Sequence, residues 1–155
     1  MSVRRIIGPS FLCILGFVTL AGRASRPKPD ALTPAETARL AAAAPSGITA
    51  VFRLESKSFR WGEGPERGAV YLFSASDYRF PGCLTIFITA QAVKALQAAG
   101  EEAPFAFSGR LVEVKGTAKR VRARASNTAL YADKLYDRTQ IDVDSANQIR
   151  IIPPE

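Results

Sequence analysis

Leu84-Thr85-Ile86-Phe87-Ile88-Thr89 (LTIFIT) runs directly into residues 90–99 (AQAVKALQAA). The first stretch is a short apolar run, which is typical of a buried strand. The second has helical spacing, with Val93 and Leu96 on one face and Gly100 as a stop signal. The chain is therefore expected to change from strand to helix at residue 90, and the other elements are ordered around this junction.

Two further strands are expected on either side of this junction. Residues 48–59 alternate, with Phe52 and Leu54 on one face and Arg53 on the other. The five expected strands are residues 48–59, 69–74, 84–89, 111–122 and 140–152. Three strands, a helix and two strands is the order of an OB-fold, a five-stranded Greek-key barrel. We therefore expect an all-β domain with accessory helices. A mixed α+β sheet is the alternative, but the chain lacks the alternating βαβ pattern of a parallel sheet.

Several short segments also resemble a known protein family in their amino-acid sequence. They are residues 68–73 (GAVYLF), 77–79 (DYR), 83–88 (CLTIFI), 109–117 (GRLVEVKGT), 139–144 (TQIDVD) and 148–149 (QI). Together they resemble the small bacterial OB-fold domains of the nucleic-acid-binding type, here in an exported version. The resemblance covers roughly residues 47–152 and implies a fold more directly than an activity. Those domains usually carry Gly-Arg-Pro just before Gln140, where this chain has Asp137-Arg138-Thr139.

Residues 1–24 have the anatomy of a secretory signal peptide. Arg4 and Arg5 are followed by the apolar residues 11–20 (FLCILGFVTL), and small residues suited to cleavage follow. We expect cleavage and export to the periplasm or the extracellular space. The alternative is an uncleaved N-terminal membrane anchor, but the apolar stretch is at the short end of the roughly 17–25 residues that a spanning helix needs.

Residues 25–46 are expected to form a linker and a short helix, and residues 47–155 the OB-fold domain. The prolines in residues 26–30 (RPKPD) favour an extended chain. Thr33-Pro34-Ala35-Glu36 has the pattern of a helix start, with Thr33 as N-cap. The helix would run to residue 44, and a helix so short needs a docking site to be stable.

The basic charge of the chain is concentrated in one segment. The 155 residues include 21 Lys and Arg against 14 Asp and Glu, and loss of three arginines with the signal would leave 18 against 14, a charge of +4. Residues 110–124 alone carry six basic residues against Glu113, a charge of +5. They form the expected fourth strand and lead into a loop that grips ligands in OB-folds, so phosphate contacts are predicted. The alternative is a solvated hairpin whose charges block edge pairing.

An aromatic face is the second candidate for binding. If Val70 and Leu72 point inward, Tyr71, Phe73 and Phe87 share the outer face on which nucleic-acid-binding OB-folds stack bases. A bulge near Gly116 is expected to turn the basic side chains that follow it outward together. The predicted binding residues are Arg53, Tyr71, Phe73, Phe87, Lys115, Lys119, Arg120, Arg122, Arg124 and Arg138. The alternative is that the helix at 33–44 covers these rings, which would remove the stacking face.

The sequence argues against catalysis. It contains no histidine, which excludes Ser-His-Asp and Cys-His chemistry and the commonest zinc ligand. We find no calcium-loop pattern and no thermonuclease-like arrangement. We therefore expect a non-enzymatic binding module without metal or cofactor. By resemblance its most favoured ligand is single-stranded nucleic acid or another polyanion.

Two other functions stay open as alternatives. One is a cell-envelope OB-fold protein that binds a small ligand, a glycan or a protein partner. The other is a degenerate hydrolase of the thermonuclease type. Cys83 would be the only cysteine left after cleavage, and the apolar residues that follow it predict a buried, inert thiol.

Overall fold

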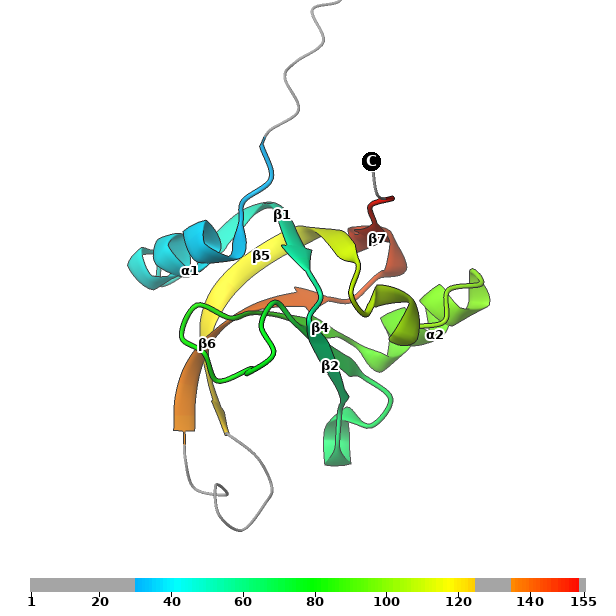
Figure 1. Cartoon of the computed structure of the whole chain (residues 1–155). Coiled ribbons are helices and arrows are strands. Elements are labelled where there is room, and N and C mark those ends of the chain that lie inside the picture. The colour runs from blue at the N-terminus through cyan, green and yellow to red at the C-terminus, as the bar shows by residue number, and fades with distance from the viewer. Residues whose placement is uncertain (1–29, 125–134, 154–155) are drawn as a thin grey trace, which may run out of the picture.

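The regular secondary structure of the described residues is mostly β-sheet, with two α-helices (Figure 1). This computed structural model describes residues 30–124 and 135–153. The strands are β1 (Ile48–Glu55), β2 (Ser58–Trp61), β3 (Val70–Phe73), β4 (Leu84–Ile88), β5 (Leu111–Arg124), β6 (Leu135–Val143) and β7 (Ile149–Ile151). The helices are α1 (Pro34–Ala43) and α2 (Ala90–Ala98), and single 3-10 turns lie at Gly64–Glu66, Phe105–Phe107 and Ala146–Gln148. Within these residues no helix is long and apolar enough to cross a membrane.

The strands form one mixed sheet in the order β1-β5-β6-β4-β3-β2, and β7 also pairs with β5. Every pairing is antiparallel except that of β4 with β6, which is parallel. In the part of the chain described, no pairing joins β1 to β2, so the hydrogen-bonded order is not closed. These two strands are nevertheless consecutive in the chain, with only Ser56 and Lys57 between them.

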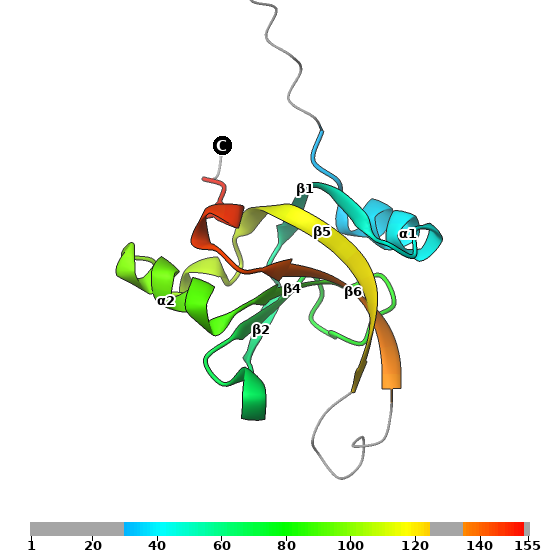
Figure 2. The same ribbon diagram turned by 180° about the vertical axis from the view of Figure 1, so that it is seen from behind.

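Alternate residues of the strands build one apolar core. Leu84, Ile86 and Ile88 of β4 have no exposed surface, and neither do Phe52 of β1 and Val114 of β5. Removal of these side chains from water is the main force that holds the sheet in this shape. Helix α2 adds three more core residues, namely Ala92, Val93 and Leu96. The two helices lie on opposite sides of the molecule in both views (Figures 1 and 2).

The predicted helix after Thr33 is confirmed as α1. The hydroxyl of Thr33 accepts a hydrogen bond from the Glu36 amide (3.4 Å), and the Thr33 amide donates to Glu36 Oε2 (2.9 Å). This reciprocal cap satisfies two amides at the start of the helix. Leu32, between the predicted linker at residues 26–30 and the helix, pairs with β1. Its amide donates to Val51 O and its carbonyl accepts from Arg53 N, both at 2.9 Å. Residues 1–24, the predicted signal peptide, lie outside the described residues.

The sequence predicted five strands, and residues 30–124 and 135–153 form seven. The expected first strand is divided into β1 and β2 because the chain changes partners at the break: Ser56 N donates to Arg110 O, and Lys57 N donates to Phe73 O. The expected fifth strand is divided into β6 and β7 by the 3-10 turn at Ala146–Gln148. The helix predicted between strands three and four is confirmed as α2.

The expected bulge near Gly116 is absent. The register of β1 with β5 runs without interruption from Ile48 opposite Ala118 to Glu55 opposite Leu111. Gly116 instead makes room for a core side chain, since a Cβ built on it would lie 2.9 Å from Ile141 Cγ2.

Candidate functional site

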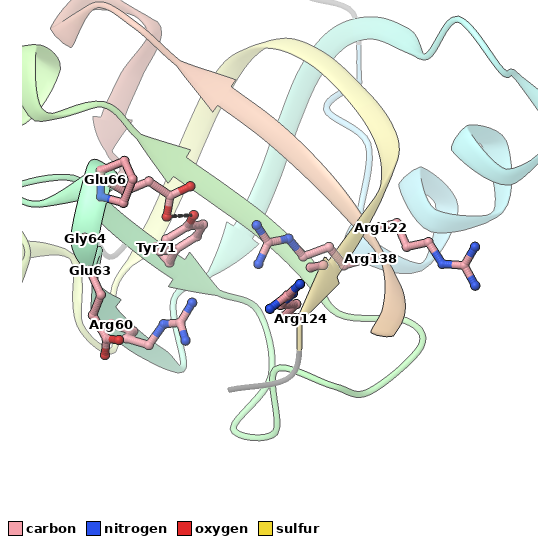
Figure 3. Close-up of a pocket in the computed structure, with 10 residues that line it drawn as sticks. Arg60, Glu63, Gly64, Glu66, Tyr71, Arg122, Arg124 and Arg138 are labelled. Carbon is pink, nitrogen blue, oxygen red and sulfur yellow. Dashed lines mark hydrogen bonds between the residues drawn. The ribbon is translucent and has the colours of Figure 1, made fainter. Parts of the chain in front are cut away.

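An open pocket of about 440 Å³ is lined by residues of β2, the turn after it, β3, β5 and β6 (Figure 3). Four arginines line it, namely Arg60, Arg122, Arg124 and Arg138, and we call it the arginine pocket. Glu63 and Glu66, from the turn after β2, are its two acidic residues. Gly64 in this turn adopts a positive φ of 58°, a conformation that favours glycine. The lining residues therefore include four arginines and two glutamates.

Tyr71 of β3 also lines this pocket. Its side chain is buried, and its hydroxyl donates a hydrogen bond of 2.5 Å to Glu66 Oε2. Burial, with help from this hydrogen bond, raises the pKa of Tyr71 to about 12. The guanidinium carbons of Arg138 and Arg60 lie 4.9 and 5.2 Å from its ring centroid. Tyr71 is therefore a neutral phenol at neutral pH, and its ring supports two guanidinium groups through cation–π contact.

The two arginines that contact Tyr71 have unused hydrogen-bonding capacity. The Nε atoms of Arg60 and Arg138 are buried, and neither has a hydrogen-bond partner within the described residues. Figure 3 shows the Arg138 side chain directed toward Tyr71, whereas the Arg122 side chain points away from it. A buried donor without an acceptor is costly, and an anionic oxygen that reached it would form a charge-assisted hydrogen bond. The arrangement is therefore suited to an anion.

The structure brings three of the predicted basic residues together in this pocket, Arg122, Arg124 and Arg138. It adds Arg60, which the sequence analysis missed because the expected first strand ended at residue 59. Arg60 is opposite Tyr71 in the pairing of β2 with β3. Alternation continued from Phe52 and Leu54 would have placed Arg60 on the core face, because the break between β1 and β2 reverses the parity and Phe59 packs on the core instead.

The other predicted basic residues lie outside the arginine pocket. Lys119 Nζ is 2.8 Å from Asp142 Oδ2, and the hydrogen bond between them raises the pKa of Lys119. Arg120 Nη2 is 3.0 Å from Asp137 Oδ2. Arg53 on β1 is 3.2 Å from the buried carboxylate of Glu113. Lys115 is nine residues before Arg124 on β5, a separation of up to about 30 Å along an extended strand. Lys119, Arg120 and Arg53 thus have acidic partners within the protein.

The predicted aromatic face exists, but its rings are not open to solvent. Tyr71 and Phe73 are 3% and 2% exposed, and Phe87 is half-buried with its ring 4.8 Å from that of Tyr71. Tyr78 belongs to the connection between β3 and β4, and its ring centroid lies 5.5 Å from that of Phe73. Helix α1, the cover considered from the sequence, packs instead mainly on β1 and β5. Tyr78 and the two arginines cover the rings, so neither Tyr71 nor Phe73 can stack on a base in this structure.

The structure also describes Cys83 and the side chains that could bind a metal ion. Cys83 is 1% exposed and free, which confirms the predicted burial. Across residues 30–124 and 135–153, no three His, Cys, Asp or Glu side chains are grouped closely enough to hold a metal ion.

No family model matches the chain, and no curated protein is detectably similar to it. Among solved structures, the chain is similar to a crystal structure described as an aspartyl-tRNA synthetase from Leishmania major Friedlin. The TM-score is 0.48 at 10% sequence identity, and the match covers 86% of this chain and 22% of that one. The chain thus spans about a fifth of the length of that structure. A likeness of this degree assigns neither a fold family nor an activity.

Proposed function

We propose that the sheet is an OB-fold barrel whose first strand consists of β1 and β2 together. Three features support this. β1 pairs with β5 while β2 pairs with β3, so the divided strand reaches both ends of the sheet order. The parallel pairing of β4 with β6 and the position of α2 between β4 and β5 are those of strands three, five and four in an OB-fold.

In this assignment the arginine pocket occupies the usual ligand position of an OB-fold. OB-fold ligands bind on the face of strands two and three, between the loop after strand one and the loop before strand five. Here Tyr71 belongs to strand two, Glu63 and Glu66 to the loop after strand one, and Arg124 to the end of strand four.

We propose that the protein is an exported, non-enzymatic module that binds single-stranded nucleic acid, or a similar polyanion, in this pocket. The observation that carries the proposal is that four arginines line the pocket, two of which have a buried Nε without a partner among the described residues. Guanidinium groups bind phosphate through paired hydrogen bonds. Their planes also stack on unpaired bases, a role that the covered rings of Tyr71 and Phe73 cannot take. Export rests on the signal-like residues 1–24.

Fluorescence anisotropy with a labelled single-stranded oligonucleotide of about twelve nucleotides tests this proposal. Binding should weaken between about 50 and about 200 mM salt, because each phosphate neutralised adds about −0.7 to the log–log slope. Arg122→Gln/Arg124→Gln should weaken binding and make this slope shallower by about one.

The matched control is Arg39→Gln/Lys94→Gln, which removes the same charge from exposed positions on α1 and α2. Absence of binding at low salt, binding that does not depend on salt, or equal weakening by the control would each reject the proposal.

A second candidate is recognition of a small anionic ligand, as in an envelope binding protein. The size of the pocket and the burial of its rings favour it, since small-molecule sites fall between about 300 and about 1,000 Å³. A mononucleotide or inorganic phosphate that competes as tightly as the oligonucleotide would identify this function instead.

A further inference from the structure

A second pocket, of about 410 Å³, lies between the end of β2 and the segment that follows α2. Trp61 and Phe105 are its aromatic residues, and Glu101 and Glu102 its charged ones; we call it the tryptophan pocket. No lysine or arginine lines it. Its charge is therefore opposite in sign to that of the arginine pocket and to the net charge of +7 of the whole chain.

Its aromatic side chains are unusually open. Trp61 is 40% exposed and Phe105 is 64% exposed, among the few large hydrophobic side chains that are exposed in the described residues. The Phe105 ring stands edge-on to Phe59, with ring centroids 5.4 Å apart and planes at 82°. This contact holds the Phe105 ring in place while leaving most of its surface bare. Exposed aromatic surface held in a fixed position marks an interaction site.

The acidic side chains beside these rings are available to a ligand. Glu101 and Glu102 are both exposed, and neither takes part in an ion pair among the residues that the structure describes. A cation placed against the face of an indole or phenyl ring is attracted by the ring quadrupole. Two carboxylates at the same pocket add direct charge attraction. Rings and carboxylates together therefore select a positively charged group.

We propose that the tryptophan pocket binds the guanidinium or ammonium group of a basic peptide segment on a partner protein. Arginine and lysine combine a cationic head with an apolar stem, and the stem would lie on the exposed surface of Phe105 while the head reaches the carboxylates. Charge complementarity thus selects the class of partner.

The two pockets lie on opposite faces of β2. Arg60 and Trp61 are consecutive residues of this strand, and successive side chains of a strand point to opposite faces. Their partners on β3 show the same alternation, with Arg60 opposite Tyr71 and Trp61 opposite the core residue Val70. A basic peptide in the tryptophan pocket would therefore not displace an anion from the arginine pocket.

Trp61 is the single tryptophan of the chain, so its fluorescence reports directly on this pocket. The probe is a capped peptide, Ala-Arg-Arg-Leu, and its control has citrulline in place of both arginines, which keeps the shape and removes the charge. The arginine peptide should change the emission of Trp61 saturably, and the citrulline peptide should bind at least about tenfold more weakly.

Glu101→Gln/Glu102→Gln should weaken binding of the arginine peptide about tenfold, because both charges are lost at exposed positions. The control, Glu55→Gln/Asp137→Asn, removes two exposed acidic groups elsewhere and should leave binding unchanged. No saturable change, equal binding of the citrulline peptide, or equal binding by the Glu101→Gln/Glu102→Gln variant would overturn the proposal.

Two other occupants are tested by two additional measurements. Tetramethylammonium that binds as tightly as the arginine peptide would indicate a small-cation site and would overturn the assignment to a peptide. Sedimentation velocity of the protein alone tests self-association. An oligomer that disappears in the Glu101→Gln/Glu102→Gln variant, without binding of the peptide, would identify a second copy as the occupant and overturn the proposal.

Discussion

The raised pKa of Tyr71 makes the stability of the protein depend on pH in the alkaline range. Its pKa of about 12 in the folded chain compares with about 10 for an unfolded tyrosine. Because the folded state holds this proton more tightly, the stabilisation is complete below about pH 10 and is lost as the pH rises toward 12. A difference of about two units corresponds to about 2.7 kcal/mol of unfolding free energy at 25 °C.

Tyr71→Phe isolates this contribution, because phenylalanine cannot ionise. Urea unfolding of both proteins between about pH 9 and about pH 12 should show the native protein losing about 2.3 kcal/mol more than the variant by pH 12, where the folded-state phenol is half ionised. Tyrosinate absorbance of the native protein minus that of the variant should have its midpoint near pH 12 in the folded state. In urea the same difference should have its midpoint near pH 10. A folded-state midpoint near 10 would show that the phenol is hydrated and that the buried Tyr71–Glu66 contact is wrong.

Three further predictions concern stability. Phe52→Ala should lower the unfolding free energy by about 3–5 kcal/mol, because the side chain is fully buried in the core; a loss below about 1 kcal/mol in urea unfolding would contradict its position. Gly116→Ala should cost about 1–3 kcal/mol in the same assay, since the new methyl group would meet Ile141 at 2.9 Å; an unchanged midpoint would reject this packing. Thr33→Ala should cost about 1 kcal/mol and speed amide exchange in α1 selectively, because the reciprocal cap is removed; unchanged exchange in α1 would argue against the cap.

Elements with local signals were predictable from the sequence. The spacing of Val93 and Leu96 before Gly100 located α2, and Thr33 with Glu36 located the start of α1. The division of the first strand was not predictable in the same way. The break at Ser56–Lys57 arises because the chain changes from β5 to β3 as its hydrogen-bonding partner, and alternation within the strand carries no information about partners.

The candidate site was only partly predictable for a related reason. The count of charged residues located Arg122 and Arg124. Whether a basic side chain is paired within the protein, however, depends on which acidic side chains lie near it across the sheet. Lys119 lies within reach of Asp142 because of the register of β5 with β6, and this register is a long-range property. Burial of Tyr71 likewise depends on Arg138, a residue sixty-seven positions away in the sequence.

The four-residue strand β2 contributes a residue to each of the two pockets, and this constrains which sequence changes the protein can accept. Its pleat separates Arg60 from Trp61, so a point substitution can alter one pocket and leave the other intact. Insertion or deletion of a single residue in β2 before Arg60 would reverse the alternation and direct both side chains to the opposite face, removing both pockets at once. Homologues that keep either pocket should therefore vary the composition of β2 but conserve its length.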